Sequence, residues 1–137
     1  MQIKNKLNFP IVWLIIFLLF NFNLYAEEFD ISAKEIIIDK ENNTLIGKGS
    51  VIAKDSQGKI IYAEKITYKK SKEFLLAEGK VKIDDNEGNI LNADKASYDK
   101  VNEIIITYSN TNLILKEGHK LISKNIYYNT LKKVLTS

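Results

Sequence analysis

The sequence FLLAEGKVKID, which spans residues 74–84, alternates between two kinds of side chain along its length. Successive side chains of a β-strand point to opposite faces of the sheet. A period of two therefore predicts a strand with one apolar face and one mostly charged face. The apolar series is Leu75, Ala77, Gly79, Val81 and Ile83.

This strand is part of a unit that recurs every 30 residues, in segments that begin at Ala33, Ala63, Ala93 and Ser123. Self-similarity at a fixed period indicates a stacked array of one supersecondary unit, here in about three and a half copies. The same shift relates Ile38 to Tyr68, Tyr98 and Tyr128, Leu45 to Leu75, Ile105 and Leu135, and Gly58 to Gly88 and Gly118.

Turn-forming residues separate the strands of each copy. The sequences of residues 55–58 and 85–88 both begin with Asp and end with Gly, and residues 39–43 and 99–102 are rich in Asp and Asn. Asp caps its own turn and Gly adopts positive φ, so these segments predict tight connections. We expect an all-β fold of about eight antiparallel strands, at residues 30–38, 44–54, 59–68, 74–84, 89–98, 103–116, 120–128 and 132–136.

The shorter strand of each copy changes face in its middle. Ile61 and Ala63 share one parity, whereas Ile66 and Tyr68 share the other. A one-residue change of face requires a bulge or a sharp bend. A bend at the same place in every copy predicts a sheet that folds over itself. Small residues of the longer strands either permit that curvature or leave space inside: Gly47, Gly49, Ala77 and Gly79.

The first 26 residues are typical of a secretion signal. Lys4 and Lys6 precede an apolar run from Ile11 to Phe20, and Ala26 precedes two acidic residues. This order predicts a signal peptide at residues 1–26 with cleavage after Ala26, followed by one domain at residues 27–137. An uncleaved N-terminal anchor is the alternative.

Composition excludes several classes of protein. Removing Lys4 and Lys6 from the 20 basic residues leaves 18 against 17 acidic ones, a net charge of +1. Nucleic-acid binding depends on clustered positive charge, so no nucleic-acid partner is expected. The chain has no Cys, which rules out a disulfide framework and thiolate chemistry.

No catalytic or cofactor motif stands out. The single histidine, His119, lies in a predicted turn, where it is expected to be solvated. The adjacent carboxylates Asp84 and Asp85 point to opposite faces of a strand, which places them poorly for one substrate. We expect neither an enzyme, a metal site nor a cofactor.

The repeats resemble a known family. The sequences AEKITY (residues 63–68), ADKASY (residues 93–98) and LLAEGKV (residues 75–81) are similar to the OstA-like repeat of the lipopolysaccharide-transport proteins. The third copy departs from this pattern, with Ser109 and Thr111 in place of Gly79 and Val81. The resemblance implies an open β-jellyroll, shaped like a folded V, that holds lipid acyl chains between its sheets in the periplasm. It also implies lipopolysaccharide, other jellyroll domains joined by edge-strand pairing, and the outer-membrane assembly complex as partners.

Two groups of residues are candidate lipid contacts. The inner apolar series would contact acyl chains, although an ordinary filled core explains it equally well; it comprises Ile36, Ile38, Ile66, Tyr68, Leu75, Val81, Ile83 and Ile105. Four lysines would contact lipid phosphates at the rim, with a solvated strand face as the alternative: Lys65, Lys80, Lys82 and Lys95.

The place of the chain within this transport system is a further expectation. The sequence ends at Ser137 in the middle of a repeat, which favours the N-terminal periplasmic part of the outer-membrane assembly protein over a short bridge protein or the anchored inner component. The competing hypothesis from another class is a structural β-solenoid of the adhesin type, with a dry core and no ligand.

Overall fold

The computed structural model describes residues 29–137, and this part of the chain contains nine β-strands and one short 3₁₀ turn, η2 (Lys70–Lys72). The strands are β1 (Asp30–Ser32), β2 (Glu35–Asp39), β3 (Thr44–Lys54), β4 (Ile60–Lys69), β5 (Phe74–Asp84), β6 (Ile90–Asp99), β7 (Ile104–Ile114), β8 (Lys120–Asn129) and β9 (Val134–Thr136). The all-β prediction is confirmed. The first expected strand is divided at residues 33–34, which is why there are nine strands and not eight. The proposed signal segment and its cleavage site after Ala26 lie outside the described residues.

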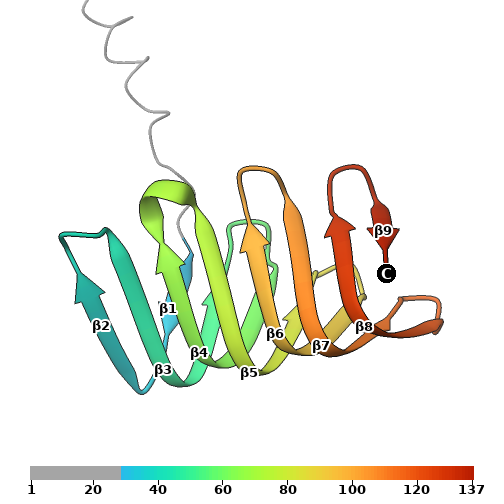
Figure 1. The fold of residues 1–137 in the computed structure, drawn as a ribbon, viewed down its shortest axis with the longest axis horizontal. Helices are drawn as coiled ribbons and strands as arrows, with labels where there is room; N and C mark the ends of the chain where they lie inside the picture. The colour runs from blue at the N-terminus through green and yellow to red at the C-terminus, as the bar shows by residue number, and fades with distance from the viewer. Residues whose placement is uncertain (1–28) are drawn as a thin grey trace, which may run out of the picture.

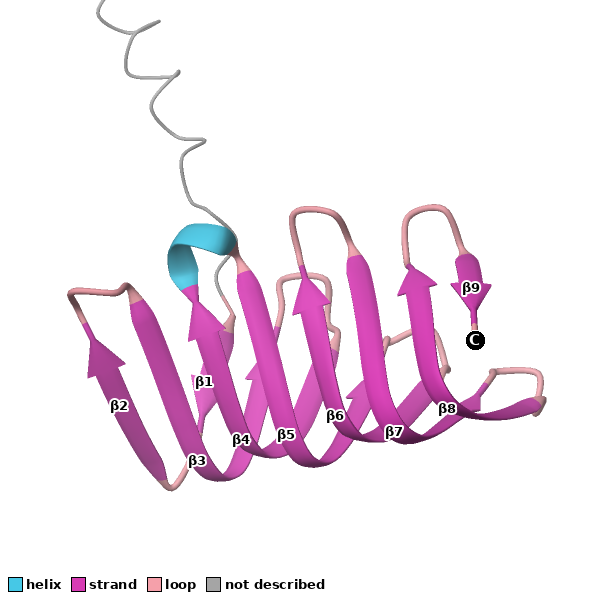
Figure 2. Cartoon of the chain, viewed as in Figure 1, coloured by secondary structure: helices cyan, strands magenta, loops and turns pink. Residues whose placement is uncertain are grey.

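The strands form one antiparallel meander that bends across its middle (Figures 1 and 2). Neighbours in sequence pair throughout, and both β1 and β2 pair with β3. The bend gives two layers. The front layer holds β2, β9 and residues 44–48, 65–69, 74–78, 95–99, 104–108 and 125–129. The back layer holds β1 and residues 52–54, 60–62, 82–84, 90–92, 112–114 and 120–122. The fold is therefore an open β-jellyroll with a V-shaped section.

Each bend is a bulge of one extra residue in the longer strand. The register between β5 and β6 shifts between the pairs Glu78–Lys95 and Val81–Ala93. In that gap Gly79 and Lys80 have φ of 83° and 46°. At the equivalent bulge of β7, Ser109 and Asn110 have φ of 67° and 49°. Two successive left-handed residues turn the strand sharply, and Gly is the residue that adopts this conformation with least strain.

The turns carry the chemistry that the sequence predicts. Asp55 Oδ1 accepts hydrogen bonds from the backbone N–H groups of Gln57 and Lys59, both at 2.9 Å. At the opposite rim, the Asp99 carboxylate accepts from the backbone N–H (3.0 Å) and the side-chain amide (2.7 Å) of Asn102. These turns form the two rims of the V: residues 40–43, 70–73, 100–103 and 130–133 in front, and residues 55–59, 85–89 and 115–119 behind.

The apolar core lies between the layers. The predicted change of face is present: Ile61, Ala63, Ile66 and Tyr68 of β4 are all buried, because each half of the strand turns its apolar side toward the opposite layer. The small residue Gly47 leaves no space, since a Cβ there would lie 3.0 Å from Val51 Cγ1. The middle of the V is therefore packed.

Candidate functional site

Six of the eight predicted inner residues form this packed middle. Their side chains are at most 3% exposed and belong to one apolar cluster: Ile66, Tyr68, Leu75, Val81, Ile83 and Ile105. Burial to this extent leaves no room for an acyl chain beside Ile66, Tyr68, Leu75 and Val81 in the closed V. Their contact with lipid stays a prediction, and it requires the layers to separate.

The other two, Ile36 and Ile38, lie at the open β2 end of the V. They pair across the strand with Gly47 and Leu45, and directly paired residues share a face, so both point inward. They are nevertheless 44% and 63% exposed, since β2 is an edge strand. This end of the interior is open to solvent.

Phe29 closes the mouth of the V above the core. Its ring packs nearly perpendicular to the rings of Tyr68 and Tyr98 of the front layer, with centroid distances of 5.2 and 5.9 Å. The Lys100 ammonium lies 5.3 Å from the centroid of the Phe29 ring. Phe29 precedes the first strand, so the periodicity of the strands did not predict this contact.

A buried polar network joins the two rims beside Phe29. The Lys59 ammonium, from a back-rim turn, donates to the Tyr98 hydroxyl at 2.9 Å, and that hydroxyl donates to Glu103 Oε2 at 2.7 Å. The Lys59 Nζ also lies 3.7 Å from Glu103 and 3.8 Å from Asp55. One buried ammonium thus lies between two carboxylates inside the mouth, and this network joins a back-rim turn to a front-rim turn.

The interior is hollow at the end of the V opposite to β2, between β7, β8 and β9. A cavity of about 290 Å³ opens there, with an apolar floor made by Leu113, Leu121 and Leu135 and with Tyr128 and Lys133 at its margin. A smaller apolar recess leads inward from it to Ile83, Leu91, Ile105 and Ile126. Two of the predicted inner residues, Ile83 and Ile105, thus form the deep end of the hollow.

A polar cavity of about 260 Å³ lies above the hollow at the mouth. Its walls include Lys59, Asp85, Glu103, Tyr128 and Lys133. Tyr128 lines this cavity and both apolar spaces, so it stands at the boundary between them. Burial is the main cause of a raised pKa for the Tyr128 hydroxyl. The site is amphipathic, with an apolar floor below a charged mouth.

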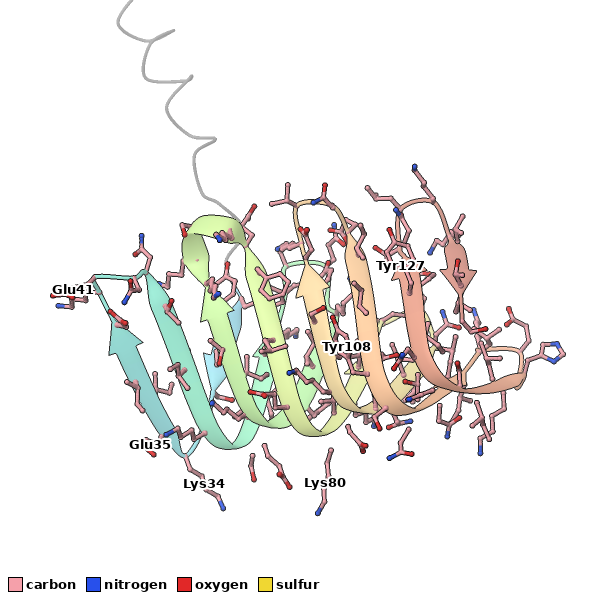
Figure 3. The ribbon with its side chains drawn as sticks, in the orientation of Figure 1. Lys34, Glu35, Glu41, Lys80, Tyr108 and Tyr127 are labelled. Atoms are coloured by element: carbon pink, nitrogen blue, oxygen red, sulfur yellow. The ribbon has the colours of Figure 1, made fainter. Side chains whose placement is uncertain are left out.

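The four predicted phosphate-contacting lysines lie away from this mouth. Lys65 and Lys95 flank Glu78 on the outer face of the front layer, with Nζ–Oε distances of 3.9 and 3.8 Å. Lys82 lies on the outer face of the back layer, 5.5 Å from the Tyr62 ring. Lys80 lies at the bend and points away from the molecule (Figure 3). Contact of these four with lipid phosphate stays a prediction, and their geometry favours a solvated face.

Four residues that line the hollow were not among our candidates, although the repeat contained the signal for most of them. Tyr128 and Leu135 occupy the same repeat positions as the predicted residues Tyr68 and Leu75. Leu113 and Leu121 occupy the positions of Ile83 and Ile61 in the same way. Extending the inner series to the equivalent positions of the later copies would have found Leu113, Tyr128 and Leu135, but not Leu121, because Ile61 was not in that series.

Other kinds of site have little support in residues 29–137. This part of the chain holds no group of three metal-ligating side chains, and His119 is exposed. None of its helical segments has the length and apolar character needed to cross a membrane.

Comparison with known proteins identifies the fold. No family model matches the sequence, and no curated protein does. Among solved structures, LptH of Pseudomonas aeruginosa matches with a TM-score of 0.72 and 12% identity, over 81% of this chain and 82% of that one. The two chains share one fold. LptH is the LptA-homologous periplasmic component of the lipopolysaccharide transport device of that bacterium. The jellyroll implied by the OstA-like resemblance is confirmed, and the β-solenoid alternative is wrong as a fold because the strands form an antiparallel meander.

Proposed function

We propose that this chain is a periplasmic lipopolysaccharide-binding module that passes lipid toward the outer membrane. The observation that carries the proposal is the amphipathic hollow at the β7–β9 end. Its floor is apolar, its mouth is charged, and it opens to solvent. An amphiphile with acyl chains and a polar head group has the matching chemistry.

Energetics favour such a ligand. Each methylene group removed from water contributes about 0.8 kcal/mol, so five of them in the hollow contribute about 4 kcal/mol. A lipid that moves between two similar hollows changes its free energy little, which suits a carrier better than a catalyst. Export by the segment 1–26 would place the domain in the periplasm.

The sheet edges supply a route for passing lipid between domains. β2 and β9 are the outermost strands of the front layer, and strands alternate in direction between them. A second copy placed beside the first would therefore bring its β2 antiparallel to β9, which is the pairing that extends the meander. Exposed strand edges recruit other strands in this way. Stacked domains would align their interiors into one path.

Within the transport system, we propose the N-terminal periplasmic part of the outer-membrane assembly protein, with a short bridge protein as the alternative. Co-purification from cells after crosslinking distinguishes them. Recovery of β-barrel sequence on the same polypeptide supports the first, and a free chain crosslinked to separate partners supports the second.

Photocrosslinking to lipopolysaccharide in intact cells tests the proposed function. A photoreactive residue replaces Leu121 or Leu135 in the hollow, and Val81 or Ile66 in the packed middle. Ile122 is the matched control, since it follows Leu121 in β8 but is 72% exposed on the outer face.

Adducts at Leu121 and Leu135 with none at Ile122 would support a lipid-carrying hollow. Additional adducts at Val81 and Ile66 would show that the layers separate to admit lipid along the whole V. If a folded, exported protein gave no adduct at any inner position, the domain would be a dry repeat and the proposal would fail.

A further inference from the structure

A second tie joins the rims directly over the hollow. Lys133, in the front turn between β8 and β9, lies 2.9 Å from Glu87 Oε2, in the back turn between β5 and β6. These two residues are 46 positions apart in sequence and belong to opposite layers. Both line the polar cavity above the hollow. The ion pair therefore spans the entrance.

This tie differs in burial from the one at Lys59. The Lys59 and Glu103 side chains are only 7% and 14% exposed, whereas those of Lys133 and Glu87 are 60% and 63% exposed. An exposed ion pair is weak and is screened by salt, so it opens and closes readily. The buried network keeps its partners away from water.

The element that carries Lys133 is also lightly attached. β9 pairs with β8 through only three residue pairs, from Tyr127–Thr136 to Asn129–Val134. The neighbouring pair of strands, β7 and β8, has nine such pairs. Thr130, at the start of the turn, donates hydrogen bonds to Glu103 from its backbone N–H and its hydroxyl, so movement confined to residues 131–136 breaks few backbone contacts. Such weakly attached segments are the ones that open locally.

We propose that the Lys133–Glu87 pair is a latch over the hollow, and that its release lets residues 131–136 swing away from Thr130 and admit an amphiphile. The Lys59–Tyr98–Glu103 network stays closed during this movement and keeps the two layers joined. This proposal rests on the function proposed above. It assigns lipid entry to the β9 end of the domain.

The charges around the mouth indicate which kind of ligand can displace Glu87 from Lys133. Asp85, Glu87 and Glu103 outnumber Lys59 and Lys133 along the cavity wall. Lys59 is already matched with Glu103 and Asp55. Lys133 is therefore the cation on which an entering anionic head group can replace Glu87. Release of Glu87 and binding of the ligand would then be one exchange of partners.

Cysteine crosslinking tests the latch, and the chain has no native Cys to interfere. The variant Glu87→Cys/Lys133→Cys is joined by a short reducible crosslinker. The matched control is Gln57→Cys/Asn86→Cys, whose side chains line the same cavity but lie in neighbouring turns of one layer. Stopped-flow fluorescence then follows association of a dansyl-labelled fatty acid before and after reduction.

Locking Glu87 to Lys133 is expected to slow probe association about tenfold, with recovery on reduction and a change of less than about twofold in the control. The variant Glu87→Gln, which loosens the latch but keeps the Lys133 ammonium, should associate about two- to fivefold faster than the parent, as expected for loss of an exposed pair. Equal rates for the locked and reduced forms would overturn the latch while leaving lipid binding intact. If the parent chain bound neither the probe nor lipopolysaccharide, the proposed function itself would fail and the latch with it.

Discussion

Replacement of Lys59 by Met should destabilise the domain strongly, even though the variant keeps the apolar stem of the side chain. Lys59 is the cation of the buried mouth network, in contact with Tyr98, Glu103 and Asp55. Its loss leaves the Asp55 side chain, which is 0% exposed, without the ammonium that lies 3.8 Å from its Oδ2. Removing one partner of a buried ion pair costs about 3–5 kcal/mol.

The lower end of that range applies here. Asp55 keeps its two backbone hydrogen bonds, and Glu103 still accepts from Tyr98 and from the Thr130 hydroxyl. We therefore expect a loss of about 3 kcal/mol. With a urea m-value of about 2 kcal/mol per M, the midpoint of unfolding falls by about 1.5 M.

Urea unfolding followed by circular dichroism measures this shift. Lys133→Met is the control, since it removes an exposed pair and should cost at most about 1 kcal/mol. The double variant Lys59→Met/Asp55→Asn should recover part of the loss, because it removes the uncompensated charge. A loss below about 1 kcal/mol for Lys59→Met, or no recovery in the double variant, would refute the reasoning.

Three further predictions concern stability and ionisation. Ser109→Gly should raise the free energy of unfolding by about 1 kcal/mol, because Ser109 holds a φ of 67° that Gly adopts without strain. Thermal unfolding measures this change, and a lower Tm for the variant would contradict the prediction. Ile66→Ala should cost about 2–4 kcal/mol at a fully buried position, whereas Ile38→Ala at an exposed one should cost much less, a contrast that urea titration measures. Hydrogen bonds from Asn102 hold the pKa of the Asp99 carboxyl below its ordinary value of 3.8, so its stabilising contribution is present above that value and is lost as the pH falls through the lowered pKa. In Asn102→Ala, NMR titration should find the Asp99 pKa nearer to 3.8, and an unchanged pKa would contradict the assignment.

The sequence by itself determined the strands, the turns and the bend. Alternation in residues 74–84 and the 30-residue period placed each strand close to its observed bounds, because these patterns act over a few residues. The change of face between Ala63 and Ile66 predicted the folded V, since a strand cannot bury both series without bending. Ser109, where the third copy departs from the repeat, holds the same left-handed conformation as Gly79, so the bend is kept without the glycine.

Only the tertiary structure decided where the interior is filled and where it is open. Tyr68 and Tyr128 occupy equivalent positions in the repeat, yet Tyr68 is buried against Phe29 while Tyr128 borders a cavity. The difference comes from the neighbouring strands of the sheet. Long strands lie on both sides of Tyr68, whereas one neighbour of Tyr128 is β9, which has only three residues. The ties at Lys59 and Lys133 join turns of opposite layers, and no local pattern encodes which turns meet across the mouth. Packing between layers depends on distant parts of the chain, so it appears only once the sheet has bent.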